Sequence, residues 1–143
     1  MMKKLIDRTE SVVRFSEVDA MKVIWHGNYV KYLEDGRESF GQTFDLDYLR
    51  IAEEGFVDPI VNMNIDYKQF VKYGDSVIIE TEYVNLPAAK LMFKYRIYRK
   101  SDHVLAAEAT TTQVFLDNEG QLQLTNPSFF LDWKVKQGLL EKA

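Results

Sequence analysis

Residues 28–40 read NYVKYLEDGRESF, and this stretch decides the fold class. Its apolar and small residues recur at helical spacing, at Tyr29, Leu33, Gly36 and Phe40. Charged residues occupy the other side, so the pattern predicts one long amphipathic helix with Asn28 as its N-cap. Glycine weakens a helix by about 0.5 to 1 kcal/mol relative to alanine. We therefore expect another backbone element to approach the helix closely at Gly36.

Beyond this helix the sequence alternates with period two, which is typical of β-strands. Strands are expected at residues 61–68, 77–83, 90–100 and 104–116, and a short one upstream, between residues 8 and 16. The turns Tyr73-Gly74-Asp75 and Ser101-Asp102-His103 join successive strands tightly. Strands joined in this way are antiparallel, so we expect a meander of about four strands.

Two shorter helices are expected beside these strands. One spans residues 45–54, with Gly55 placed to end it in the left-handed conformation. The other begins after Asn126-Pro127 and extends towards Leu139. The order of elements predicts a single α+β domain over residues 1–143. One long helix covers only a stripe of such a sheet, so we expect a homodimer or homotetramer that protects the remainder.

Composition excludes several classes of protein. Hydrophobic residues make up 46% and charged residues 28%, the balance of an ordinary globular domain. The formal net charge of −4 argues against a nucleic-acid partner. Cysteine is absent and only His26 and His103 are present, which argues against disulfides, a thiolate nucleophile and a metal site. With no signal peptide and no 18-residue apolar run, we expect a cytoplasmic protein without a membrane partner.

The candidate chemistry lies in residues 13–29, which read VRFSEVDAMKVIWHGNY. The motifs GxSxG, GxGxxG and HExxH are absent from the chain. Asp19 and His26 stand on either side of an apolar run just before the long helix. Unpaired N–H groups and the positive end of the helix dipole at that point could stabilise an oxyanion formed from a carbonyl. By residue type alone, however, an Asp in a loop more often forms a turn, and a lone His more often packs as a hydrogen-bonded residue.

Two segments of this stretch, Glu17-Val18-Asp19 and Trp25-His26-Gly27-Asn28-Tyr29, resemble the signature of the 4-hydroxybenzoyl-CoA thioesterase family of hotdog-fold acyl-CoA thioesterases. The later segments Ile65-Asp66-Tyr67-Lys68 and Tyr73-Gly74-Asp75 are similar to that family's sheet pattern. The resemblance covers about residues 11–116. It implies a hotdog fold, an antiparallel sheet wrapped around a long central helix, with active sites at a dimer interface.

The resemblance also implies roles for individual residues. Asp19 matches the family's catalytic carboxylate, which acts as nucleophile or as general base towards water. His26 matches the residue whose backbone N–H polarises the thioester carbonyl. Further substrate-binding residues are predicted at Trp25, Gly27, Asn28, Tyr29, Asn62 and Lys90, with the regions around Asn62 and Lys90 supplied by a second protomer. No metal or redox cofactor is required.

The sequence departs from the family pattern at three places. Lys22 stands where the family commonly has glycine, and Phe70 replaces a frequent proline. Around residues 87–90, where some members carry several basic residues against coenzyme A phosphates, only Lys90 is basic.

The leading hypothesis is therefore an acyl-CoA thioesterase. One alternative is a non-catalytic acyl-CoA-binding module of the same fold, for which a carboxylate aimed at a helix start has no physical use. Another is a dehydratase or hydratase of hydroxyacyl or enoyl thioesters, which needs a His and a carboxylate facing each other across the substrate. The acyl group, and the choice between coenzyme A and carrier-protein thioesters, stay open at this point.

Overall fold

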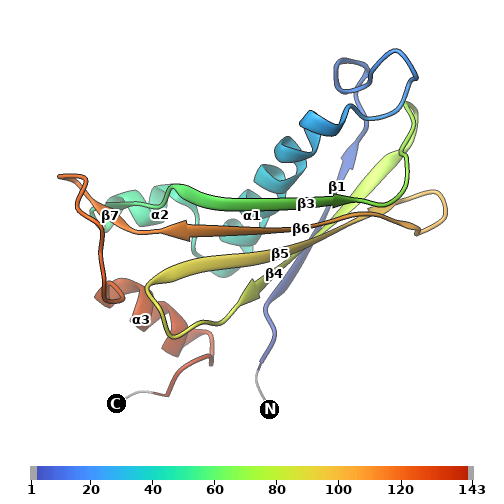
Figure 1. Ribbon diagram of the computed structural model, residues 1–143. Coiled ribbons are helices and arrows are strands. Elements are labelled where there is room, and N and C mark those ends of the chain that lie inside the picture. Colours follow the sequence, from blue (N-terminus) through green and yellow to red (C-terminus); the bar gives the residue numbers. More distant parts are fainter. Residues whose placement is uncertain (1–2, 142–143) are drawn as a thin grey trace.

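The computed structural model describes residues 3–141 as a long helix packed against a twisted antiparallel sheet (Figure 1). The helices are α1 (Tyr29–Phe44), α2 (Tyr48–Glu53) and α3 (Ser128–Lys136). The five strands of the sheet are β1 (Ile6–Val12), β3 (Ile60–Tyr67), β4 (Ser76–Val84), β5 (Lys90–Arg99) and β6 (Leu105–Val114). A separate pair is formed by β2 (Phe56–Val57) and β7 (Leu116–Asp117). The predicted α+β class and the long helix are confirmed.

The order of strands in the sheet is β1-β4-β5-β6-β3, and every neighbouring pair is antiparallel. Strands β4, β5 and β6 form a meander of three strands, where about four were predicted. The hairpin expected across Tyr73-Gly74-Asp75 is wrong, because β3 pairs with β6 at the far edge and β1 occupies the place beside β4. Residues 68–75 instead run along the loop before α1, where Val71 O accepts a hydrogen bond from Ile24 N at 2.9 Å.

The apolar stripe of α1 packs against β1 and β4. Tyr32, Leu33 and Phe40 are fully buried in this contact, and burial of side chains of this size is the main source of folding free energy. A Cβ atom at Gly36 would collide with the side chains of Ile79 and Thr81 of β4. The close approach at this glycine is real, but it is made by side chains and not by the backbone that we expected.

The predicted helix at residues 45–54 is real but shorter. Asp45 takes the left-handed conformation (φ 58°) and ends α1, so residue 45 cannot begin the next helix. Asp47 is the N-cap of α2, because its Oδ1 accepts a hydrogen bond of 2.8 Å from Arg50 N. Gly55 follows with φ 89°, as predicted. The strand expected between residues 8 and 16 is β1, which begins earlier, at Ile6, and ends at Val12, where the chain leaves the sheet.

Helix α3 closes the end of the sheet away from the loop before α1 (Figure 1). Trp133 packs edge-to-face on Tyr83 of β4 with 5.2 Å between ring centroids, and its Nε1 donates to Phe44 O. The helix begins after Pro127 as predicted but ends at Lys136. Within residues 3–141, no helix has the length and the apolar character needed to cross a membrane.

Candidate active site

The loop between β1 and α1 is folded tightly on itself at one end of the molecule (Figure 1). It starts with a short 3-10 helix, Phe15–Glu17, and ends with a second one, His26–Asn28, which continues directly into α1. Between them, Val18 and Ile24 form an antiparallel bridge, and Trp25 N donates to Glu17 O at 2.9 Å. The two ends of the loop therefore lie side by side.

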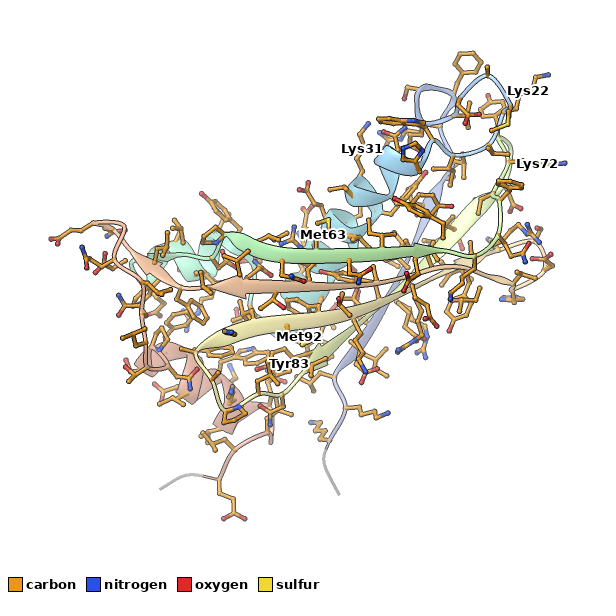
Figure 2. All side chains as sticks on the ribbon, in the orientation of Figure 1. Lys22, Lys31, Met63, Lys72, Tyr83 and Met92 are labelled. Atoms are coloured by element: carbon orange, nitrogen blue, oxygen red, sulfur yellow. The ribbon has the colours of Figure 1, made fainter. Side chains whose placement is uncertain are left out.

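Asp19 is placed by a tight turn. Its Oδ1 accepts a hydrogen bond of 2.8 Å from Met21 N, and its carbonyl accepts one of 2.9 Å from Lys22 N. Lys22 adopts φ 65°, the left-handed region that glycine enters most easily. This explains why glycine suits this position in the family pattern, and it shows that lysine is accommodated here. Lys22 lies with Lys72 at the loop end of the molecule (Figure 2), and Val23 forms a bridge with Lys72.

A cavity of about 350 Å³ brings Asp19 and His26 together. The apolar part of its wall comes from the loop and from the segment after β3, at Met21, Val23, Ile24 and Phe70. Tyr29 of α1 and Tyr67 of β3 complete the aromatic part. Lys68 and Gln69 also line the cavity. The cavity is therefore a largely apolar chamber with a few polar groups on its wall, a composition typical of a small-molecule site.

The start of the helix offers backbone donors beside this chamber. Asn28 N and Tyr29 N are bonded to the carbonyls of Trp25 and His26. In the part of the chain that the structure describes, the N–H groups of His26 and Gly27 have no acceptor. The hydroxyl of Tyr67 donates to His26 O at 2.9 Å and so fixes the orientation of this peptide. The arrangement provides unpaired donors at the positive end of a helix, where developing negative charge is stabilised.

Tyr29 supplies a third kind of group to the chamber. Burial, helped by the neighbouring Tyr67, raises the pKa of Tyr29 to about 12. Its hydroxyl therefore stays protonated at neutral pH, where it can donate a hydrogen bond but cannot act as a base. The rings of Tyr29 and Tyr67 meet edge-to-face with centroids 5.2 Å apart.

The other predicted site residues lie outside the wall of this chamber. Trp25 is 48% exposed and covers Gly27, where a Cβ atom would collide with the indole ring. Asn28 occupies the N-cap position of α1 as predicted, but its side chain makes no capping bond and its Nδ2 donates to Glu17 O at 2.9 Å. Asn62 and Lys90 are exposed on β3 and β5. In a single chain, Asp19, His26 and Tyr29 are thus the predicted residues that the structure brings together.

A second and larger cleft, of about 740 Å³, lies between α1 and the start of β3 and was not predicted. Arg37, Asp58 and Gln113 line it, and Gln113 Nε2 donates to Asp58 Oδ2 at 2.8 Å. Burial raises the pKa of Asp58 to about 6, against the opposing influence of Arg37. No sequence signal announced this carboxylate, since Asp58-Pro59 is also typical of an ordinary turn.

Comparison with protein families places residues 13–134 in the thioesterase-like superfamily. The chain belongs to this superfamily. It is a hotdog-fold thioester hydrolase, and the predicted family resemblance is confirmed.

Relatives of this thioesterase carry names that agree with the family. YneP of Bacillus subtilis (strain 168) is named as a candidate acyl-CoA thioesterase. It is 27% identical to this chain over 128 residues, which cover 90% of this chain and 92% of YneP. Acyl-CoA thioesterase YbgC of Haemophilus influenzae is 26% identical over 106 residues, covering 73% and 76%. The chloroplastic acyl-acyl carrier protein thioesterase ATL3 of Arabidopsis thaliana is 24% identical over 110 residues, covering 77% and 58%.

Solved structures share the fold of the thioesterase. The DHNA-CoA thioesterase of Staphylococcus aureus superposes with a TM-score of 0.83 at 23% identity, over 93% of this chain and 91% of that one. The 4-hydroxybenzoyl CoA thioesterase of Pseudomonas sp. strain CBS-3 gives 0.78 at 22% identity, over 90% and 98%. At these identities the likeness shows the fold alone.

Proposed function

We propose that this thioesterase hydrolyses the thioester bond of an acyl-coenzyme A in the chamber lined by Asp19 and His26. The observation that carries the proposal is that Asp19 lines the same cavity as His26, whose backbone N–H has no acceptor among the described residues. Nucleophilic attack on a thioester carbonyl needs an oxygen to form the new bond and donors to hold the oxyanion. Asp19 and His26 supply these two parts on the wall of the same cavity.

Asp19 supplies the attack in one of two ways. As a nucleophile, its carboxylate oxygen bonds to the carbonyl carbon, the carbon–sulfur bond breaks, and coenzyme A leaves as a thiolate. Water then cleaves the resulting anhydride and restores the carboxylate. As a general base, Asp19 takes a proton from water while the water oxygen bonds to the carbonyl carbon. The carbon–sulfur bond then breaks, and the proton held by Asp19 passes to the departing thiolate.

The helix start stabilises the charge that forms on the carbonyl oxygen. The N–H of His26 lies in the short 3-10 helix just before α1, at the end where the helix dipole is positive. Removal of one such donor from an enzyme typically costs about 10²- to 10³-fold in kcat. The imidazole of His26 and the protonated hydroxyl of Tyr29 are available to orient the substrate or the water.

Coenzyme A is proposed as the carrier because YneP and YbgC are both named for acyl-CoA substrates, and YneP is matched over most of both chains. The name of ATL3 makes an acyl-carrier-protein thioester the competing choice. The chamber is lined by both aromatic and aliphatic side chains, so aromatic and aliphatic acyl groups should both be tried as substrates.

The active enzyme is proposed to be a homodimer or homotetramer with composite sites. Within residues 3–141, no strand pairs with the outer edge of β3, and Val61 on that strand is 58% exposed. An open edge with apolar side chains favours association of a second copy. Contact of Asn62 and Lys90 with substrate would then come from the partner, since neither lines the chamber of its own chain.

A hydrolysis panel tests the proposed function. Purified full-length protein is supplied with short, long and aromatic acyl-CoAs and with an acyl-carrier-protein thioester, and release of free thiol is recorded. The proposal predicts turnover of at least one acyl-CoA, with a higher kcat/KM than for the same acyl group on the carrier protein. Binding of acyl-CoA without thiol release would support the non-catalytic module instead.

A further inference from the structure

Glu17 is a buried carboxylate that the proposed mechanism does not use. The residue is 6% exposed and lies at the end of the first 3-10 helix, and it does not line the chamber. Acidic side chains are almost never buried unless hydrogen bonds or charges compensate for the lost hydration. A carboxylate held in this way two residues before Asp19 calls for a physical explanation.

The side chain of Glu17 is bonded to both neighbouring elements. Its Oε1 accepts a hydrogen bond of 2.7 Å from the hydroxyl of Tyr32 and one of 2.9 Å from Arg14 N. Tyr32 is fully buried on α1. Burial and the bond to Glu17 raise the pKa of Tyr32 well above its ordinary value, so this hydroxyl remains a donor over the whole working range of pH. Glu17 thereby joins the start of the loop to the body of α1.

The backbone of Glu17 is bonded to the other end of the same loop. Its carbonyl oxygen accepts 2.9 Å hydrogen bonds from Trp25 N and from Asn28 Nδ2. Asn28 is thus used to hold the loop closed rather than to cap α1. A single residue therefore connects the beginning of the loop, its end and the helix.

Asp19 and His26, the two residues of the proposed mechanism, both lie next to residues that Glu17 holds in place. Asp19 lies two residues after Glu17, and His26 directly follows Trp25, which is bonded to Glu17. A misplacement of about 1 Å between reacting groups can lower a rate by about 100-fold. We propose that Glu17 is a positioning residue, whose carboxylate fixes the spacing between the Asp19 carboxylate and the N–H groups at the start of the helix.

This inference rests on the proposed thioester hydrolysis, but it also predicts an effect that needs no substrate. If Glu17 holds the loop, its removal must loosen the hydrogen bonds Trp25 N to Glu17 O and Asp19 N to Val23 O. Amide hydrogen exchange at these two positions should become at least tenfold faster in Glu17→Ala, while amides of β5 keep their protection. Unchanged exchange at both positions would overturn the inference, whatever the activity.

The kinetic test uses three variants with acyl-CoA as substrate. Glu17→Ala should lower kcat by about 10- to 100-fold with KM nearly unchanged. Glu17→Gln keeps an amide oxygen that can accept from Tyr32 and Arg14, so most of kcat should return. Tyr32→Phe removes one of the two donors and should give an intermediate loss.

Tyr95→Phe is the matched control for Tyr32→Phe. It also deletes a buried tyrosine hydroxyl, one whose hydrogen bond, of 2.6 Å, is to Thr111 Oγ1 within the sheet. Both variants should lose stability, but only Tyr32→Phe should lose kcat. Wild-type kcat in Glu17→Ala, or equal kcat in the two Tyr→Phe variants, would show that Glu17 has only a structural role. If the wild-type protein released no thiol, the proposed function would fail, and the exchange experiment would still decide the role of Glu17.

Discussion

Asp19 Oδ1 accepts a hydrogen bond of 2.8 Å from the backbone N–H of Met21, while the same side chain lies on the wall of the cavity shared with His26. Asp19 thus has the structural role expected of a loop aspartate, and its place in the cavity is compatible with the catalytic role that we propose for it. The two roles use different atoms, because one carboxylate oxygen completes the turn. They can therefore be separated by a substitution that preserves an acceptor at Oδ1.

Replacement of His26 by alanine should have a modest effect. The proposed contribution of this residue is its backbone N–H, which alanine retains, so only positioning by the imidazole is lost. We expect kcat to fall by about tenfold, measured by thiol release at saturating acyl-CoA. A loss as large as that caused by removing the Asp19 carboxylate would make the imidazole the acid or base and favour the dehydratase hypothesis.

Lys22→Gly should leave the free energy of unfolding at its wild-type value or raise it by up to about 1 kcal/mol. Relief of the left-handed strain at φ 65° is worth about 1 to 2 kcal/mol, and the greater freedom of glycine in the unfolded chain offsets part of it. Lys22→Val places a β-branched residue at the same backbone angles and should destabilise the protein. Urea unfolding of both variants checks this prediction, and the reverse order would contradict it.

Asp58→Asn should stabilise the protein at neutral pH but not in acid. Burial raises the pKa of Asp58 from 3.8 to about 6, so the folded state binds this proton more tightly than the unfolded chain. The contribution of Asp58 to stability is thus fully present below pH 4 and is lost as the pH rises through about 6. At pH 7 we expect a gain on the order of 1 kcal/mol, because partial solvent access reduces the full effect of the shift.

Thermal or denaturant unfolding from pH 4 to pH 8 measures this gain. Asp132→Asn, an exposed site on α3, serves as the control and should change little at any pH. A gain for Asp58→Asn that is the same at pH 4 and pH 8 would show that the effect does not come from titration of Asp58.

Assembly is predicted from the open edge of β3 and from the partial cover that α1 gives the sheet. Light scattering at micromolar concentration should report a dimer or a tetramer. Dilution that dissociates the assembly should lower the specific activity, because Asn62 and Lys90 are proposed to reach the chamber only from a second copy. A fully active monomer would refute the composite site.

Much of the fold could be predicted because its signals are local. The spacing of Leu33, Gly36 and Phe40 predicted α1, and the glycine predicted the close contact with β4. The wrong hairpin arose because a turn at Tyr73-Gly74-Asp75 constrains only the chain direction. Pairing of β1 with β4 depends on residues about 70 positions apart, for which the local pattern carries no information.

The candidate site was predicted only in part, because only its residues that are close in sequence could be connected. Asp19 and His26 are close in sequence and could be connected through the resemblance, and the structure places both in one chamber. Tyr67 and Tyr32 were not predicted as parts of the site, because their bonds to His26 and Glu17 span 41 and 15 residues. Asp58 was missed because its altered pKa comes from burial by other elements, which the sequence pattern does not reveal.

The most direct test of the account is the turnover of Asp19→Asn. The asparagine Oδ1 can still accept from Met21 N, so the melting temperature should stay within a few degrees of the wild-type value. Loss of the nucleophile or base should lower kcat for acyl-CoA by about two to four orders of magnitude. A stable Asp19→Asn protein with wild-type turnover would contradict the proposed mechanism.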